Sequence, residues 1–176
     1  MVVILWRGAA AMDNKALYLL AKFDDNTQEI LSGYYEILQQ HGFIGRQTKN
    51  IPYHFTLGSY GTEQEGNLIT KLDEVCRDFK PIEIKLDHLG LFGLNVLFVE
   101  PNMNFELLQL QKSFFDNCGN GFHPWTAHAT ILLDEPDEIL RAIPILAENF
   151  KPFKACIESI ALFEFFPTRF IKEITL

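Results

Sequence analysis

The 176-residue chain has few cysteines and no long hydrophobic run, and both features narrow the classes of protein to which it can belong. Its three cysteines, Cys76, Cys118 and Cys156, are odd in number and form no Cys-x-x-Cys pair. This favours reduced, mostly buried thiols over a disulfide framework. No stretch is long enough to span a membrane, and the apolar residues 2–6 are too few for the hydrophobic region of a signal peptide. We therefore expect a cytoplasmic protein with no membrane partner.

Basic residues are also in short supply, with 15 Lys and Arg against 23 Asp and Glu and a formal net charge of −8. Sequence-independent binding to duplex nucleic acid depends on many Lys and Arg contacts to phosphates, so this charge argues against duplex DNA as a partner. It is compatible with a small anionic ligand held by a few donors. The chain lacks a low-complexity linker, and its length suits one domain with a substantial core. We expect that domain to be a monomer.

One short pattern occurs twice: His, any residue, Thr and an aliphatic residue, at residues 54–57 and again at 128–131. In a β-strand successive side chains point to opposite faces, so the His and the Thr of each copy share a face. The intervening residue, Phe55 in the first copy, then points into a core. Each strand is expected to present an imidazole beside a hydroxyl on an apolar support.

The surroundings of the two motifs are repeated as well. Residues 79–92 align with residues 150–163, an offset of 71 positions, and an aliphatic and aromatic pattern runs through both. We interpret this as an internal duplication with a first half at 16–93 and a second half at 94–176. Residues 1–15 do not join the repeat and are expected to be an N-terminal extension.

Hydrophobic periodicity predicts the same element order in each half: strand, helix, motif strand, helix, strand. The expected helices cover residues 27–40, 62–79, 105–119 and 137–150, with a kink or a shifted start in the last one at Pro144. The expected strands cover 17–23, the two motifs, 82–92, 95–99, 153–165 and 170–175. This order predicts an α+β fold with two mainly antiparallel sheets that form a central cleft, and with the helices outside.

If the motif strands face each other, two imidazoles and two hydroxyls converge on one small volume. Histidine titrates nearest neutrality, so one copy can accept a proton while the other donates one. Threonine hydroxyls can donate to phosphoryl oxygens, on which charge builds in a transition state. This chemistry needs no metal or other cofactor. A metal site is not expected, because neither motif has carboxylate or cysteine neighbours at ligand spacing.

The paired motifs in a duplicated chain of this length resemble the two-histidine (2H) phosphoesterase superfamily, which includes the bacterial 2′-5′ RNA ligase-like proteins. The resemblance implies a bilobal fold and a hydrolase active in RNA processing. Such an enzyme opens 2′,3′-cyclic phosphates without a metal, and 2′-5′ RNA ligation stays open as a second activity. It implies that the catalytic residues are His54, Thr56, His128 and Thr130. By family analogy, His128 is expected to be the base and His54 the acid.

The chain departs from the family pattern shortly after the second motif, where members that act on RNA ends often carry a basic residue. Leu132 and Leu133 occupy that stretch here. With the acidic net charge, this favours a small phosphorylated nucleotide or RNA end over long RNA. Two alternatives stay open: a non-catalytic module that binds nucleotides or RNA ends, and a phosphoesterase whose substrate is not a nucleotide.

Four further residues are candidates for substrate binding. Tyr53 and Trp125 flank the motifs and can stack on a base. His123 lies shortly before the second motif, and Arg46 can add positive charge near a phosphate.

Overall fold

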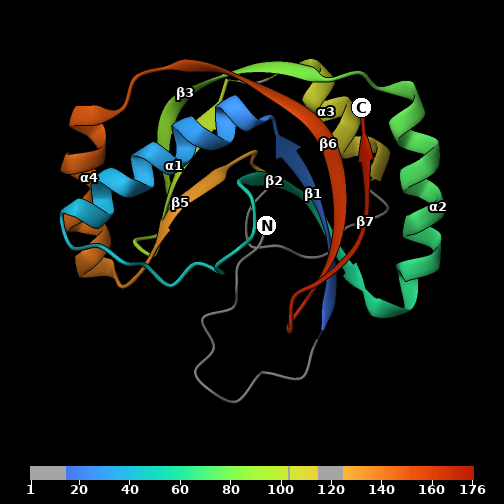
Figure 1. Ribbon diagram of the computed structural model, residues 1–176, viewed down its shortest axis with the longest axis horizontal. Coiled ribbons are helices and arrows are strands. Elements are labelled where there is room, and N and C mark those ends of the chain that lie inside the picture. Colours follow the sequence, from blue (N-terminus) through green and yellow to red (C-terminus); the bar gives the residue numbers. More distant parts are fainter. Residues whose placement is uncertain (1–14, 103, 115–124) are drawn as a thin grey trace.

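The computed structural model describes residues 15–102, 104–114 and 125–176, which form four helices and seven strands (Figure 1). The elements in chain order are β1 (Ala16–Phe23), α1 (Asp25–Gln40), β2 (His54–Gly61), α2 (Glu65–Val75), β3 (Ile82–Phe92), β4 (Val96–Pro101), α3 (Phe105–Phe114), β5 (Ala129–Leu133), α4 (Pro136–Asn149), β6 (Phe153–Phe165) and β7 (Arg169–Thr175). Short 3₁₀ turns, 62–64 and 76–78, flank α2. The predicted α+β class and element order are confirmed.

The starts of α1 and α4 differ from those predicted from the sequence. α1 begins two residues earlier than predicted, because the carboxylate of Asp24 caps it by accepting from the backbone N–H of Thr27 at 2.9 Å. α1 ends where Gly42, at φ 91°, donates from its N–H to a carbonyl of the last turn. α4 begins at Pro136 and continues through Pro144, so of the two effects expected of this proline the shifted start is wrong, and the kink stays a prediction.

The prediction of two separate sheets is wrong, because all seven strands belong to one sheet of order β2-β1-β6-β3-β4-β5, with β7 also paired to β6. Three antiparallel pairings join the two halves: β1 with β6, β3 with β4, and β3 with β6 from Ile82 opposite Ile157 to Leu86 opposite Phe153. The third strand of each half thus closes the gap that would otherwise divide the chain into two sheets.

The repeat inferred from the sequence is visible in the strand pairing. The strand order is unchanged when β1, β2 and β3 are exchanged with β4, β5 and β6. The central pair of the β3–β6 ladder is Ile84 opposite Ala155, which have the 71-residue offset of the repeat. Register shifts also match, since the extra residue is Asp87 in β3 and Glu158 in β6.

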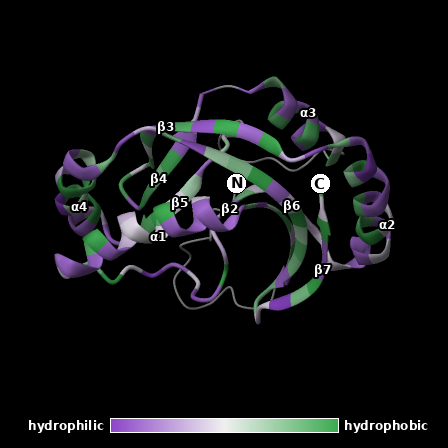
Figure 2. Ribbon diagram, turned by 45° about the horizontal axis from the view of Figure 1, so that its top comes forward, coloured by the Kyte–Doolittle hydropathy of each residue, from purple (hydrophilic) through white to green (hydrophobic). Residues whose placement is uncertain are grey.

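All four helices pack on one face of the sheet, and together they enclose the main core. α1 contacts α4, and α2 contacts α3 (Figure 1). Each helix contributes apolar residues to this core, and Figure 2 shows apolar and polar residues interspersed along the helices. The helix residues of this core are Leu31, Tyr34 and Leu38 of α1, Leu68 and Leu72 of α2, Leu107, Leu110 and Phe114 of α3, and Ile139, Ala142 and Leu146 of α4.

The opposite face of the sheet, which we call the helix-free face, carries a smaller apolar cluster. Leu20, Ala161, Phe163 and Phe165 form it, and Tyr18 and Ile51 pack against it. Leu20 of this cluster is the strand partner of Thr56 in the first motif.

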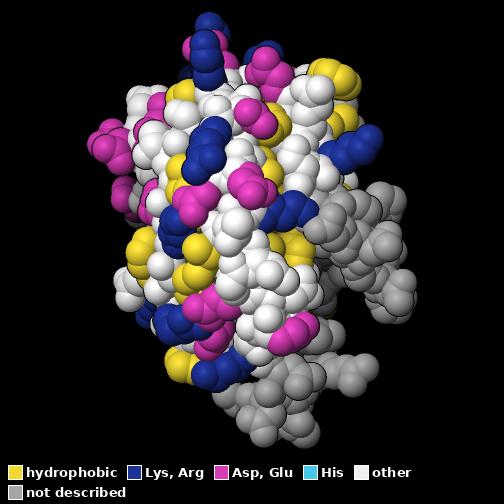
Figure 3. Space-filling model, turned by 90° about the vertical axis from the view of Figure 1, so that its right-hand side faces the viewer, with side chains coloured by type: hydrophobic (Ala, Val, Ile, Leu, Met, Phe, Trp, Pro, Cys, Tyr) yellow, Lys and Arg dark blue, Asp and Glu magenta, His cyan; other side chains and the backbone are white. Residues whose placement is uncertain are grey.

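The outer surface around α2 and β7 carries both signs of charge, interspersed (Figure 3). Lys172 of β7 pairs with Asp73 of α2 at 2.5 Å, and Arg169 bridges Glu65 and Glu164. The described residues of this side therefore form no continuous basic stripe of the kind that follows a phosphate backbone. Within the described part of the chain, none of the helices combines the length and the apolar character that a membrane crossing requires.

Candidate active site

The two motif strands are the two ends of the sheet, yet they meet. β2 and β5 stand first and last in the strand order, and residues of the two strands contact each other. The sheet must therefore curl until its edges approach. In both strands a register shift falls directly after the motif threonine, with Leu57 and Ile131 as the extra residues. Bulges of this kind bend a strand and redirect its side chains.

All four motif side chains lie on the helix-free face. Thr56 stands opposite Leu20, which belongs to the smaller cluster of that face. Thr130 stands opposite Phe98, which alternates with two residues of the main core and therefore points away from it. His54 and His128 precede the threonines by two residues and share their face. The sequence prediction that each strand presents His and Thr together is consistent with this arrangement.

Both imidazoles are held in the same way by the backbone two residues earlier. Nδ1 of His54 lies 2.7 Å from the carbonyl oxygen of Pro52, and Nδ1 of His128 lies 2.8 Å from that of Thr126. A carbonyl oxygen only accepts, so Nδ1 must carry the proton in each ring. Nε2 of both neutral rings is then the unprotonated nitrogen, left to exchange a proton with a ligand.

Aromatic rings surround the second histidine. Phe92 meets the His128 ring edge-on at 4.6 Å between centroids, and Phe98 lies at 5.2 Å. His128 is 7% exposed, whereas His54 is half-buried. Sequence reasoning missed both phenylalanines, although the match of Phe92 with Phe163 in the repeat marked it as a regular position of the fold.

Burial keeps both rings neutral. Desolvation lowers the pKa of His128 to about 4, against a smaller opposing effect of its bond to Thr126, and the neighbouring His54 lowers it further. Desolvation also lowers the pKa of His54, opposed by the bond to Pro52. The His128 ring therefore senses the charge of His54, and the lowered pKa of each ring favours its neutral form at pH 7 in the absence of a ligand.

We expect acid to destabilise the protein through His128. Between pH 6.5 and about 4 the unfolded chain binds a proton at this residue that the folded chain refuses, so the free energy of unfolding falls as the pH falls. The loss should reach about 3 kcal/mol at the acid end. Urea unfolding at pH 7 and pH 4.5 should show a smaller pH effect in His128→Asn than in the wild type. Equal pH dependence of the two proteins would contradict a buried, neutral His128.

Trp125 joins the two motifs directly. Its indole Nε1–H donates to the carbonyl oxygen of Thr56 at 2.8 Å, so a residue just before the second motif holds the backbone of the first. The ring is half-buried and packs against the main core. The predicted role of Trp125 in stacking on a base stays a prediction, and its contact with Thr56 is a structural role that the sequence did not indicate.

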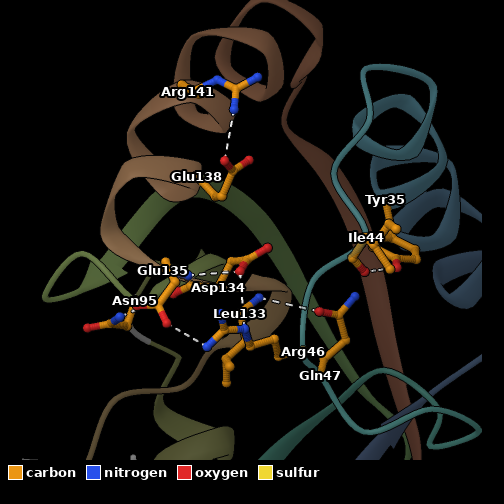
Figure 4. A network of polar contacts seen from close by, with 10 residues as sticks. All are labelled: Tyr35, Ile44, Arg46, Gln47, Asn95, Leu133, Asp134, Glu135, Glu138 and Arg141. Carbon is orange, nitrogen blue, oxygen red and sulfur yellow. Dashed lines mark hydrogen bonds and ion pairs between the residues drawn. The ribbon is translucent and has the colours of Figure 1, made fainter.

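The other predicted substrate-binding residues have different surroundings. Tyr53 packs against the main core, and burial raises its pKa. Arg46 lies in the connection between α1 and β2, where its guanidinium contacts the carboxylates of Glu135 at 2.6 Å and Asp134 at 3.5 Å (Figure 4). These acids follow β5, so Arg46 ties the connection to the second half of the chain. His123 lies outside the described residues.

Leu132 and Leu133, which follow the second motif in the sequence, are part of the fold. Leu132 and Leu133 are buried in β5. The backbone of Leu133 also accepts from the N–H of Arg46 at 2.7 Å, beside the ion pairs of that side chain. In the described ranges, His, Cys, Asp and Glu side chains do not gather in threes at metal-binding distance.

Comparisons with known proteins identify the family and the fold to which the chain is similar. A family model described as the 2′-5′ RNA ligase superfamily matches residues 36–167. Among curated protein sequences none matches the chain. The fold is similar to E. coli LigT complexed with 3′-AMP, at 16% identity and a TM-score of 0.61, over 93% of this chain and 99% of that one. It is also similar to TT0787 of Thermus thermophilus (14%, TM-score 0.67, 92% and 97%) and to a phosphoesterase (16%, 0.63, 92% and 98%).

At 14–16% sequence identity, these structural matches show a shared fold and nothing finer. The family match covers three-quarters of the chain, including both His-x-Thr motifs. The chain is therefore a member of the 2′-5′ RNA ligase superfamily, the 2H phosphoesterases.

Proposed function

We propose that the protein is a phosphoesterase that opens 2′,3′-cyclic phosphates on a small nucleotide or an RNA end. One observation carries this proposal: two equivalent His-x-Thr motifs lie on one face of the curled sheet, each with Nδ1 tied to the backbone and Nε2 left for a ligand. Paired imidazoles beside paired hydroxyls suit an in-line displacement at phosphorus, because such a step needs one base, one acid and donors for the phosphoryl oxygens.

In the proposed step a water molecule loses its proton to Nε2 of His128 while its oxygen attacks phosphorus. The bond from phosphorus to O3′ breaks, and O3′ takes the proton from Nε2 of His54, which leaves a 2′-phosphate and a free 3′-hydroxyl. The lowered pKa of His128 leaves this ring unprotonated at neutral pH and therefore able to accept the proton. His54 must be protonated as the acid, and the negative charge of the bound phosphate favours that form against the desolvation of the ring. Thr56 and Thr130 donate to the phosphoryl oxygens.

The halves at 16–93 and 94–176 are proposed to form two lobes, with the substrate between β2 and β5. The contact of these two edge strands and the exchange symmetry of the strand order support the repeat, and each half lends one strand to the other, because β6 lies beside β1 and β3 beside β4. E. coli LigT has been crystallised with 3′-AMP, with phosphate and with ATP, so a protein of this fold binds nucleotides and phosphate. We infer the same ligand class for this chain.

The test is an activity screen of the purified protein. The substrates are 2′,3′-cyclic mononucleotides, RNA ending in a cyclic phosphate, and ADP-ribose 1″,2″-cyclic phosphate. We expect a 2′-phosphate product from at least one of them and an unchanged rate in EDTA, since the step uses side chains alone. The double variant His54→Ala/His128→Ala controls for contaminating esterases. RNA with 2′-phosphate and 5′-hydroxyl ends tests ligation in the same assay.

The outcomes separate the alternatives. No turnover of any cyclic phosphate, with nucleotide binding retained in calorimetry, would replace the proposal with a non-catalytic binding module. Loss of activity in EDTA would contradict the metal-free step. Turnover of simple cyclic phosphodiesters without a base, but of none of the nucleotides, would point to a metabolite that is not a nucleotide.

A further inference from the structure

Gln28, in the first turns of α1, holds the backbone that leads into the first motif. Its side-chain Nε2 donates to the carbonyl oxygens of Tyr53 at 2.8 Å and of Phe23 at 3.3 Å. Its Oε1 accepts from the backbone N–H of Tyr53 at 2.8 Å. Carbonyl oxygens only accept, so the NH₂ group must face them, and the orientation of the amide is fixed. One side chain thus ties the end of β1 and the start of β2 to α1.

The bond to the N–H of Tyr53 reaches His54 through a single peptide group. The N–H of Tyr53 and the C=O of Pro52 belong to the same planar unit and point in opposite directions. Gln28 holds the N–H end, and the C=O end accepts from Nδ1 of His54 at 2.7 Å. Side-chain amide, peptide and imidazole therefore form one chain of hydrogen bonds, in which each bond polarises the next.

We propose that Gln28 is a positioning residue for His54. By fixing the plane of the Pro52–Tyr53 peptide, it keeps the carbonyl of Pro52 aimed at Nδ1 and so keeps the proton on that nitrogen. Nε2 of His54 is then presented to the helix-free face. Gln28 does not touch the substrate. Its effect on the tautomer of His54 stands independently, whereas its effect on turnover rests on the proposed function.

The first measurement reads the tautomer directly. Gln28→Leu removes all three hydrogen bonds with little change in volume, and Gln39→Leu, at an exposed position of the same helix, is the matched control. In ¹⁵N NMR spectra of the histidine rings at pH 7, we expect Gln28→Leu to increase the fraction of His54 protonated at Nε2. His128 in the same spectra should not change, and Gln39→Leu should leave both rings as in the wild type.

The second measurement is kinetic. Because a small misplacement of a reacting group is costly, Gln28→Leu should lower kcat roughly tenfold to a hundredfold with little change in KM. Gln28→Glu keeps an acceptor for the N–H of Tyr53 but turns a carboxylate towards the two carbonyl oxygens. Protonation of that carboxylate restores one donor, so relative to wild type the kcat of Gln28→Glu should recover as the pH falls, and that of Gln28→Leu should not.

A folded Gln28→Leu protein with the wild-type His54 tautomer and wild-type kcat overturns the proposal. If Gln28→Leu does not fold, Gln28→Glu decides in its place, by its His54 spectrum at pH 7 against that at pH 5. A wild-type protein that turns over no cyclic phosphate defeats the proposed function alone, since the spectra still decide whether Gln28 sets the tautomer.

Discussion

His54→Ala and His128→Ala should each abolish most turnover of a cyclic phosphate. A general base and a general acid each contribute about 10²- to 10⁴-fold, and kcat/KM should fall by that order in either variant. The double variant should be little worse than the poorer single one, because the acid and the base act as a unit and their losses do not add. Steady-state kinetics of the three variants on the best substrate of the screen measure this directly.

His41→Ala is the matched control for these variants. Nδ1 of His41 also bonds a backbone carbonyl, that of Ile37 at 2.9 Å, but the residue is exposed at the end of α1. Its loss should leave kcat/KM unchanged.

The wild-type kcat/KM should be bell-shaped in pH, with both limbs belonging to the coupled pair of His54 and His128. Turnover that survives the loss of both His54 and His128 would refute their catalytic role.

Elements with strong periodicity could be predicted closely from the sequence. The predicted strand at 153–165 has the bounds of β6, because alternating apolar residues run between Pro152 and a second proline, Pro167. The number of sheets could not be predicted in the same way. Alternation shows that a strand has a buried face, but not which strand lies beside it. The pairing of β3 with β6 joins the strands β2-β1-β6 to the strands β3-β4-β5 and so makes one sheet.

In the candidate site, too, the sequence predicts the motif residues but not their contacts with distant segments. The repeat located His54, Thr56, His128 and Thr130, since period-two alternation places the members of each motif on one face. The residues that support them come from distant segments: Gln28 contacts Tyr53 across 25 positions, and Trp125 contacts Thr56 across 69. No local pattern encodes such contacts. Tyr53 directly precedes His54, and neighbouring residues of a strand point to opposite faces. The ring of Tyr53 accordingly packs against the main core rather than beside His54.

Thr56→Val and Thr130→Val should slow the reaction less than loss of a histidine, but substantially. Valine keeps the shape and the strand preference of threonine and removes only the hydroxyl. If each hydroxyl donates to a phosphoryl oxygen as charge develops, its loss should cost about 2–4 kcal/mol of transition-state stabilisation, roughly 30- to 800-fold in kcat. Thr56 is 4% exposed and Thr130 is half-buried, so a hydroxyl that served only the fold would matter more at Thr56.

Serine at the same positions separates donor loss from changed packing. Thr56→Ser and Thr130→Ser keep the hydroxyl and remove a methyl group, so kcat should stay near the wild-type value even where the melting temperature falls. The valine variants should show the reverse, with stability kept and kcat reduced. If valine and serine lower kcat equally at either position, that threonine acts through the packing of its strand rather than as a donor. The proposed oxyanion contact would then belong to the other motif alone.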